Sequence, residues 1–242
     1  LLEKGYEVVV IDSYINSNKK SIDRVIELLN SNYKINNLNL KVLNADIRDE
    51  KVLDKLFSDS IKIGKPFQAV VHFAGLKSVK DSALNPLIYW DMNLNGSINL
   101  LKVMEKYNCR NIVFSSSATI YGYSNNKLLS EDTIINPINP YGRTKAAVEA
   151  LLNDIFNSNK HKWRIANLRY FNPIGAHPSG MIGEDPKGIP NNIFPYISKV
   201  AAGDLDELVV FGNDWPTSDG TGVRDYIHVM DLVEGHVRTL EY

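Results

Sequence analysis

Tyr141 and Lys145 are the residues in this chain whose types and spacing most directly suggest chemistry. They lie in the stretch Asn139-Pro140-Tyr141-Gly142-Arg143-Thr144-Lys145. Pro140 suits the first position of a helix, and the run after it has high helix propensity, so both side chains are expected on one helix face. A tyrosine has a pKa near 10, and half-ionisation at neutral pH requires about 4 kcal/mol. A neighbouring ammonium favours that ionisation, so the pattern predicts that Lys145 lowers the pKa of Tyr141 and makes it a general base.

A second pair with the same spacing, Tyr123 and Lys127, shows how easily such a pattern arises in a chain with 12 tyrosines. Its connecting residues, Ser124-Asn125-Asn126, are typical of a turn and provide no helix to hold the pair. Only Tyr141 and Lys145 have a predicted scaffold, and the elements around them must decide whether the pair is functional.

Composition excludes several classes of protein. The chain has 242 residues, a formal net charge of −1 and 44% hydrophobic residues, which predicts neither a nucleic-acid-binding nor a membrane surface. Cys109 is the only cysteine, so an internal disulfide framework is excluded and a reducing, cytoplasmic location is expected. No apolar run approaches the length of a transmembrane helix.

The elements that must position the pair follow an alternating pattern. Strands are predicted at 7–12, 40–46, 68–75, 111–115 and 164–169, and helices at 21–30, 49–57, 86–107 and 140–157. This alternation predicts an α/β fold with a doubly wound parallel sheet, in which ligands bind at the carboxyl ends of the strands. Asp12, Asp46, the Ala74-Gly75 turn and the run Ser115-Ser116-Ser117 all fall at such ends.

Asp12 allows two interpretations that the residues alone leave open. An acid that ends the second strand of a dinucleotide-binding unit bonds the adenosine ribose, roughly 20 residues after a glycine-rich turn. No G-x-G-x-x-G occurs in this sequence, so that role requires a turn and a first strand upstream of Leu1. Alternatively, Asp12 simply ends a strand. Because 1–5 reads as the tail of a helix with Gly5 just past its end, we expect the chain to be a fragment.

The pattern changes after Asn172. Residues 173–180 and 186–190 are rich in proline and glycine and are predicted to form long irregular loops, which in compact folds often bind ligands. We therefore expect one domain at 1–172 and part of a second, smaller domain at 173–242, with the chain again ending inside a helix near 231–238.

A serine at a strand end, with a tyrosine and a lysine on the following helix, can serve hydride transfer. The tyrosine removes a hydroxyl proton, the serine hydrogen-bonds the same oxygen, and a nicotinamide takes the hydride. Each part also has a plainer interpretation, because Ser115–Ser117 could be an ordinary turn and Lys145 a solvated charge on a helix. Their joint order on one α/β pattern favours the chemical interpretation.

Six longer motifs carry a resemblance to a known family. They are Phe73-Ala74-Gly75-Leu76-Lys77, Phe114-Ser115-Ser116-Ser117-Ala118-Thr119-Ile120-Tyr121-Gly122, 140–145, 168–177, 188–192 and 219–229. On these motifs the chain resembles the extended short-chain dehydrogenase/reductase family over nearly all of its length. The resemblance implies a Rossmann-type NAD-binding domain, with its first strand and glycine-rich turn missing here, followed by an incomplete UDP-sugar-binding domain.

The resemblance also implies roles for individual residues. Tyr141 is expected to be the base, Ser117 the hydrogen-bonding serine and Lys145 the ligand of the NAD ribose. The expected NAD site comprises Asp12, Asn16, Ser17, Asp46, Ile47, Phe73, Ala74, Lys77, Tyr141, Lys145 and Phe171. The expected UDP-sugar site comprises Lys77, Ser117, Tyr141, Tyr170, Asn172, Asn192, Val209, Phe211 and Arg224. Arg224 also makes independent sense, because a guanidinium pairs bidentately with phosphate oxygens, although an ion pair with Asp225 is the alternative.

The implied reaction interconverts UDP-galactose and UDP-glucose through a 4-keto-hexose, a step of galactose metabolism, in a homodimer formed through the helices 86–107 and 140–157. A nucleotide-sugar 4,6-dehydratase is the nearest alternative, but Ala118 and Thr119 stand where dehydratases place acids. An inactive NAD-binding module is the second alternative, which the intact Ser117, Tyr141 and Lys145 argue against. No metal is expected: the spacing of Asp225, His228 and Asp231 fits no standard ligand set.

Overall fold

All strand pairs in the structure are parallel, which confirms the predicted α/β class. The computed structural model describes residues 1–32, 39–123, 128–158, 162–184, 190 and 192–242. The strands form three groups: β1 (Val8–Asp12) with β2 (Leu40–Asn44); β3 (Val70–His72), β4 (Asn111–Ser115) and β5 (Arg164–Leu168); and β6 (Asn172–Ile174) with β7 (Tyr226–His228). Within the described residues β1 and β3 are not paired with each other, so the first two groups remain separate.

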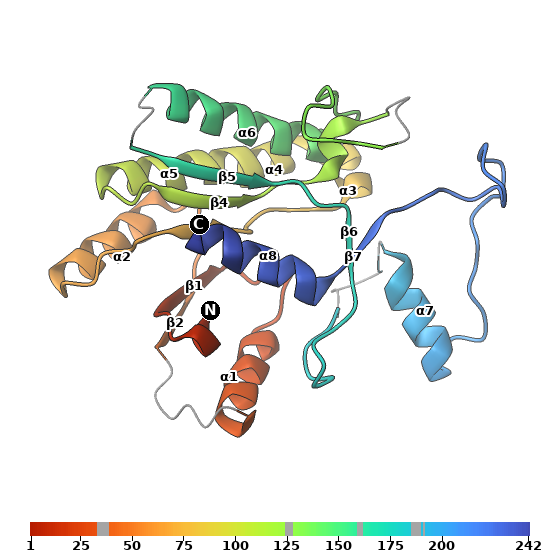
Figure 1. Cartoon of the computed structure of the whole chain (residues 1–242), viewed down its shortest axis with the longest axis horizontal. Helices are drawn as coiled ribbons and strands as arrows, with labels where there is room; N and C mark the ends of the chain where they lie inside the picture. Colours follow the sequence, from red (N-terminus) through yellow and green to blue (C-terminus); the bar gives the residue numbers. More distant parts are fainter. Residues whose placement is uncertain (33–38, 124–127, 159–161, 185–189, 191) are drawn as a thin grey trace.

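Up to β5, helical segments alternate with the strands as predicted. The helices are α1 (Lys20–Asn32), α2 (Glu50–Lys62), α3 (Val79–Leu84), α4 (Pro86–Tyr89), α5 (Gly96–Lys106), α6 (Pro140–Ser158), α7 (Ile193–Ala202) and α8 (Val229–Glu241), with 3₁₀ turns at Leu2–Lys4 and Ala118–Tyr121. Gly5 follows the first 3₁₀ turn with φ of 82°, the left-handed cap expected there. In Figure 1, α6 lies on one side of β4 and β5, and α8 lies on the other. None of the described helices is both long and apolar enough to cross a membrane.

The single helix predicted at 86–107 is instead interrupted. A π-helical segment, Trp90–Asn95, separates α4 from α5. Gly96 follows it in close contact with the segment after β2, because a Cβ there would lie 2.8 Å from Cδ1 of Ile47. Sequence periodicity does not reveal such an extra residue in a turn, and π segments are frequent at functional sites.

The hydrophobic core lies between β4 and the helices α2, α5 and α6. Its fully buried members include Leu53 of α2, Met104 of α5, Phe114 of β4 and Leu152 of α6. Cys109, directly before β4, is buried in the same cluster, which raises the pKa of its thiol to about 11 and keeps it unreactive. This core fixes α6 against the carboxyl end of β4, where the candidate catalytic residues lie.

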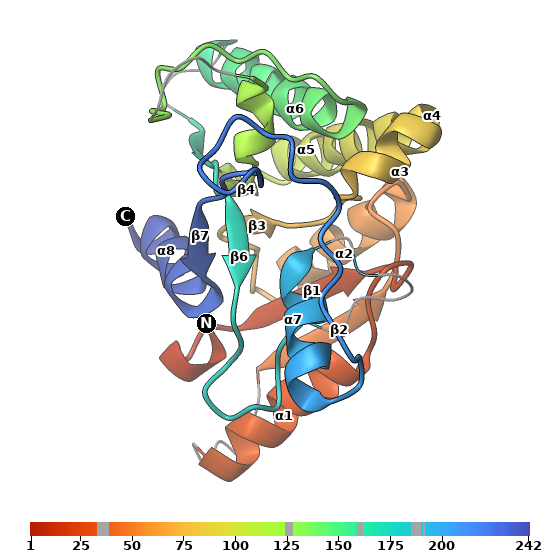
Figure 2. The same cartoon turned by 90° about the vertical axis from the view of Figure 1, so that its right-hand side faces the viewer.

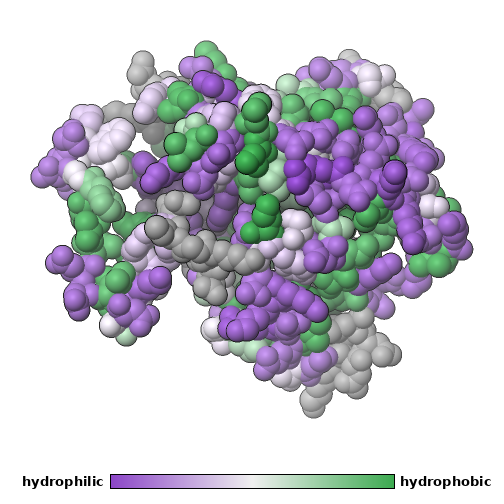
Figure 3. All heavy atoms as spheres, turned by 180° about the vertical axis from the view of Figure 1, so that it is seen from behind, coloured by the Kyte–Doolittle hydropathy of each residue, from purple (hydrophilic) through white to green (hydrophobic). Residues whose placement is uncertain are grey.

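The region after Asn172 is less compact. β6 overlaps the stretch 173–180 that was predicted as loop and pairs with β7, and α8 packs beside both strands. Between α7 and β7, 203–225 forms an extended arm, seen at the right of Figure 1 and crossing in front in Figure 2. Seen from behind, open space separates this arm from the body (Figure 3). Val209, Val210 and Phe211 on the arm are largely exposed, so it does not contribute to the core.

Leu152→Ala is expected to lower the free energy of unfolding by about 2–5 kcal/mol, because it leaves a cavity under a fully buried side chain of α6. Urea unfolding of both proteins measures the difference. Leu128→Ala is the matched control: Leu128 is 88% exposed, so its truncation should change the free energy of unfolding by less than about 0.5 kcal/mol. Equal losses in the two variants would contradict this description of the core.

Candidate active site

Tyr141 and Lys145 lie in the first two turns of α6, as predicted. Pro140 begins the helix, and Oδ1 of Asn139 accepts a hydrogen bond of 2.8 Å from the backbone N–H of Gly142, which caps the helix N-terminus. Both side chains are buried, Tyr141 with 9% and Lys145 with 6% of its surface exposed. The predicted scaffold is therefore present, and it turns the pair toward the end of β4.

Lys145 is an unusually buried ammonium group. Its Nζ donates a hydrogen bond of 2.8 Å to the carbonyl of Ser115 and lies 4.8 Å from the centre of the Phe114 ring. Burial lowers its pKa from 10.5 to about 8. Lys145 is thus not the solvated charge that was the plainer interpretation of the sequence.

The expectation that Lys145 lowers the pKa of Tyr141 is wrong for this structure. The pKa of Tyr141 is raised, chiefly because burial penalises the phenolate, while the hydrogen bond with Ser117 lowers it. The neighbouring phenols of Tyr170 and Tyr89 raise it further. Lys145 is directed at the Ser115 carbonyl and lies 6.0 Å from the centre of the Tyr141 ring. Ser117, and not Lys145, is therefore the group that favours ionisation of Tyr141.

The three serines after β4 each contact a different part of the site. The carbonyl of Ser115 accepts from Lys145, and its hydroxyl is hydrogen-bonded to the hydroxyl of Tyr170. Ser116 donates to the carboxylate of Glu149, and Ser117 caps the 3₁₀ turn that follows. Sequence reasoning missed Glu149, although its position four residues after Lys145 and eight after Tyr141 places all three on one helix face.

Asn93, in the π segment, was also missed. It is 3% exposed, and its side-chain amide bonds both the N–H and the carbonyl of Leu76, at 2.7 and 3.0 Å, and Oγ1 of Thr144 at 3.0 Å. Thr144 donates in turn to the carbonyl of Tyr141. Gly75, with φ of 152°, allows this approach, since a Cβ there would lie 2.9 Å from Oδ1 of Asn93. The turn after β3 is thereby tied to α6.

The residues predicted for the NAD site from β1 and β2 lie at the strand ends. Oδ1 of Asp12 accepts from Oγ of Ser17 at 2.9 Å, so these two are brought together, whereas Asn16 is exposed. Asp46 is engaged by Arg48, whose Nη2 lies 2.7 Å from Oδ2, and this hydrogen bond lowers the pKa of the carboxyl. Its neighbour Ile47 packs on the core.

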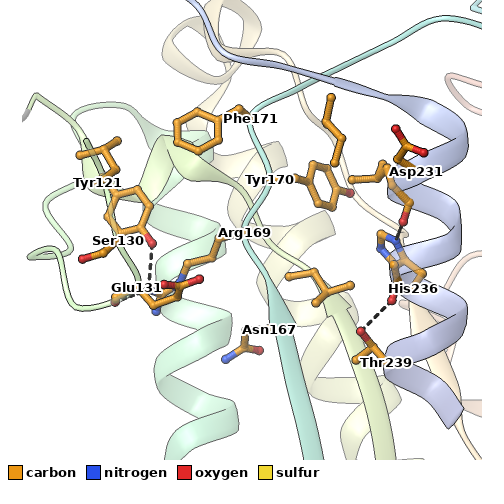
Figure 4. A pocket seen from close by; sticks show the side chains of 15 residues that line it. Tyr121, Ser130, Glu131, Asn167, Arg169, Tyr170, Phe171, Asp231, His236 and Thr239 are labelled. Carbon is orange, nitrogen blue, oxygen red and sulfur yellow. Dashed lines mark hydrogen bonds between the residues drawn. The ribbon is translucent and has the colours of Figure 1, made fainter. Parts of the chain in front are cut away.

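Phe73, Lys77 and Phe171 lie beside the site with exposed surfaces. The Phe73 ring lies tilted against that of His236 of α8, with the ring centres 4.9 Å apart, and Nζ of Lys77 lies 4.0 Å from the carboxylate of Glu184. Ala74 is half-buried in the same turn. Phe171 lines a cavity of about 510 Å³ between the end of β5 and α8, together with Tyr170 and Arg169 (Figure 4). Tyr141, Ser117 and Lys145 do not line this cavity.

The predicted UDP-sugar residues are only partly brought together. The hydroxyl of Tyr170 contacts the turn Ser115–Ser117 (the serine turn), as described above. Nδ2 of Asn172 donates to the carbonyl of Asp225 at 2.9 Å. The others are exposed: Asn192, whose Nδ2 lies 2.7 Å from Glu184, and Val209, Phe211 and Arg224 on the extended arm. Nη1 of Arg224 donates to the carbonyl of Val223, its own neighbour.

The remaining candidates carry no chemistry in the described residues. Lys127, like 188, 189 and 191 of the fifth motif, lies outside them, and Tyr123 is 76% exposed. No group of three metal-ligating side chains occurs in the described part of the chain. His72 is buried, bonds Oγ of Ser97 at 2.8 Å and has its pKa lowered by burial to about 3, so it is a neutral core histidine.

Comparisons with known proteins identify the family of this chain. The chain matches the NAD dependent epimerase/dehydratase family over residues 1–242. It is 50% identical over 240 residues to UDP-glucose 4-epimerase 2 of Arabidopsis thaliana. The matched region covers 99% of this chain and 66% of that protein. It is 49% identical over 241 residues to UDP-glucose 4-epimerase of Bacillus subtilis (strain 168), covering 100% of this chain and 67% of that protein. The chain thus spans about two thirds of the length of these relatives.

The fold is likewise similar to solved structures. UDP-glucose 4-epimerase from Bifidobacterium longum, in complex with NAD⁺ and UDP, superposes with a TM-score of 0.89 at 45% identity. The match covers 100% of this chain and 68% of that chain. The Rossmann-type fold class predicted from the sequence is therefore confirmed at the level of the three-dimensional structure.

In this chain, Tyr141 is expected to titrate above the ordinary value of 10.0, because burial raises the pKa of its phenol. The difference in tyrosinate absorbance between the protein and its Tyr141→Phe variant, followed against pH, isolates this group. Ser117→Ala should move the transition to still higher pH, since it removes the hydrogen bond that lowers the pKa. A transition below pH 10 in the unsubstituted protein would show that the electrostatic description of the site is wrong.

Proposed function

The chain belongs to the NAD dependent epimerase/dehydratase family, and we propose that it carries the catalytic residues of an enzyme that interconverts UDP-glucose and UDP-galactose. The single observation that carries the proposal is the buried group Tyr141, Ser117 and Lys145 at the end of β4. The near 50% identity to proteins named UDP-glucose 4-epimerase over the whole chain supports the choice of substrate. A place in galactose metabolism and a cytoplasmic location are parts of the same proposal.

NAD is the proposed cofactor, and the residues present fit it. Lys145 is a buried ammonium with three N–H donors, of which the Ser115 carbonyl accepts one in the described residues, so ribose hydroxyls could accept the others. Oδ1 of Asp12 accepts the bonds of Tyr14 N–H and Ser17, and within the described residues this leaves Oδ2 for a ribose hydroxyl. In this assignment 1–172 hold NAD, with Asn16, Asp46, Ile47, Phe73, Ala74, Lys77 and Phe171 around it, and 173–242 form part of the UDP-sugar domain.

In the proposed reaction, Tyr141 accepts the proton of the sugar 4′-hydroxyl, and Ser117 hydrogen-bonds the same oxygen. The NAD that Lys145 and Asp12 would hold would supply the acceptor and then the donor of the C4 hydride, so that there is no net oxidation. After the 4-keto-hexose has turned its other face toward the site, Tyr141 returns the proton. Burial of the site excludes water, which would otherwise weaken these hydrogen bonds.

A 4,6-dehydratase remains the second candidate within the family. Its elimination step needs an acid beside the serine, and here Ala118 and Thr119 occupy those positions. The backbone N–H of Ala118 bonds the carbonyl of Tyr170, and Thr119 bonds Ser117 through its own hydroxyl, so neither position offers a proton-transferring acid. This favours the epimerase.

Tyr141→Phe is expected to lower turnover of UDP-galactose by about 10²–10⁴-fold, because it removes the proton acceptor and keeps the packing of the ring. Substrate and NAD binding should remain nearly unchanged. Ser117→Ala should cost less, because it removes one hydrogen bond to the reacting oxygen. Coupled measurement of UDP-glucose formation, in a protein of the relatives' full length, tests both.

Tyr123→Phe serves as the matched control, since Tyr123 is exposed and should retain full turnover. Near-normal turnover by Tyr141→Phe would refute the proposed mechanism. So would NADH released in stoichiometric amounts with the product, because the proposed reaction has no net redox change.

We also propose a homodimer formed through the helices 86–107 and 140–157. Leu87 and Ile88 of α4 are 83% and 51% exposed, and Ala150 and Phe156 of α6 are exposed as well, so both helices offer apolar surface. This surface exceeds what the internal core uses, which supports a second copy of the chain as its partner.

Leu87→Glu is therefore expected to convert the full-length protein from dimer to monomer at micromolar concentration, because it places a charge in an apolar interface. Light scattering measures the mass, and Leu128→Glu, at an exposed position outside these helices, should remain dimeric. A monomer in the unsubstituted protein would contradict the proposal.

A further inference from the structure

Beneath the catalytic group lies a buried ion pair that the proposed reaction does not use. The side chains of Glu149 on α6 and Arg169 after β5 are 5% and 17% exposed. Nη2 of Arg169 lies 2.7 Å from Oε2 of Glu149, and Nε lies 3.1 Å from both carboxylate oxygens. Removing two charges from water is costly, and replacing such a pair with apolar residues is often neutral or stabilising. Stability alone is therefore a weak explanation for its presence.

The carboxylate of this pair holds the serine turn. Glu149 accepts the hydroxyl of Ser116, which is 1% exposed and lies between the two serines that contact the catalytic residues. On one side of Ser116, the Ser115 carbonyl accepts from Lys145; on the other lies Ser117, the neighbour that lowers the pKa of Tyr141. A displacement of Ser116 would move both contacts at once.

The guanidinium of the same pair holds the far end of the turn. Nη1 of Arg169 donates to the hydroxyl of Tyr121 at 3.1 Å and to the carbonyl of Glu131 at 2.9 Å. Tyr121 is the last residue of the 3₁₀ turn that Ser117 caps. Figure 4 shows the Arg169 side chain extending toward Tyr121 and Glu131, away from α8. Ser117 therefore lies between two anchored residues, Ser116 and Tyr121.

Helix α6 carries Tyr141 and also anchors the turn that contains Ser117. Tyr141, Lys145 and Glu149 are spaced by four residues and are all buried on one face of the helix. Tyr141 comes from this face directly, and the serine turn is attached to it through Glu149. The relative position of Tyr141 and the serine turn is thus referred to one rigid helix, which is the kind of support that catalytic geometry requires.

From this arrangement we infer that Glu149 and Arg169 are positioning residues, which act through Ser116 and Tyr121 to hold Ser117 against Tyr141. The inference rests on the proposed function for its effect on turnover, but not for its effect on the ionisation of Tyr141. Without the pair, Ser117 moves, the phenol loses the hydrogen bond that favours its ionisation, and proton transfer slows.

The test uses Ser116→Ala, Ser116→Thr and Glu149→Gln in the full-length protein. Ser116→Ala and Glu149→Gln should lower kcat by about 10- to 100-fold with little change in KM, because small displacements of catalytic groups have effects of this size. Both should also shift the pH profile of kcat/KM toward higher pH. Ser116→Thr keeps the hydroxyl and should retain most of the activity.

Leu152→Ala is the matched control on the same helix, since it destabilises α6 without touching the serine turn. It should leave kcat and the pH profile unchanged at temperatures where the protein is folded. If Ser116→Ala behaved like Leu152→Ala, with unchanged kcat and pH profile, the positioning role would be overturned.

A second measurement separates this inference from the proposed function. Tyrosinate absorbance reports the ionisation of Tyr141 without any turnover, and Ser116→Ala should shift it to higher pH. That shift in a protein without epimerase activity would refute the proposed function and uphold the positioning role. If the enzyme is active and Ser116→Ala leaves the ionisation of Tyr141 at the same pH, the proposed function is upheld and the positioning role is refuted.

Discussion

The burial of the Lys145 ammonium is the constraint on which the rest of the site depends. A pKa lowered from 10.5 to about 8 corresponds to a penalty on the charged form of roughly 3 kcal/mol. The Ser115 carbonyl and the face of the Phe114 ring are its partners from β4. Such a contact persists only where α6 is held firmly against the end of that strand, since any gap admits water and gives the ammonium a better environment.

The residues that pack α6 against the core form one row along the helix, beside the row that carries Tyr141, Lys145 and Glu149. Thr144, Val148 and Leu152 repeat at intervals of four and are 0–1% exposed, next to the row of Tyr141, Lys145 and Glu149. One row thus packs the helix against the core, and the neighbouring row carries the ionisable side chains. The apolar contacts of Val148 and Leu152 offset the cost of burying the polar row, and Thr144 links both rows to the turn after β3 through Asn93.

The sequence was sufficient for the parts of this structure that depend on local pattern. Strand and helix alternation, the start of α6 at Pro140 and the common face of Tyr141 and Lys145 follow from propensity and period, and the structure agrees. The pairing of Glu149 with Arg169 could not be predicted, because it joins positions 20 residues apart that only the packing of α6 on β5 brings together. The direction of the Tyr141 pKa was predicted wrongly for a related reason: spacing shows which groups are neighbours but not how deeply they are buried. The π segment, likewise, is followed by a close contact of Gly96 with Ile47 that no local propensity reveals.

The two pKa changes bear on how the site can work as a base. Burial lowers the pKa of Lys145 and raises that of Tyr141, so near neutral pH the phenol keeps its proton. In this state Tyr141 is suited to donate a proton, which is what the return of hydride to a keto-sugar requires. Accepting a proton demands that the phenolate be stabilised, and Ser117 is the neighbour that lowers the pKa of Tyr141 and so acts in that direction. The reactivity of Tyr141 therefore depends on the placement of one hydroxyl group, and the buried carboxylate and guanidinium next to the serine turn lie where they can fix that placement.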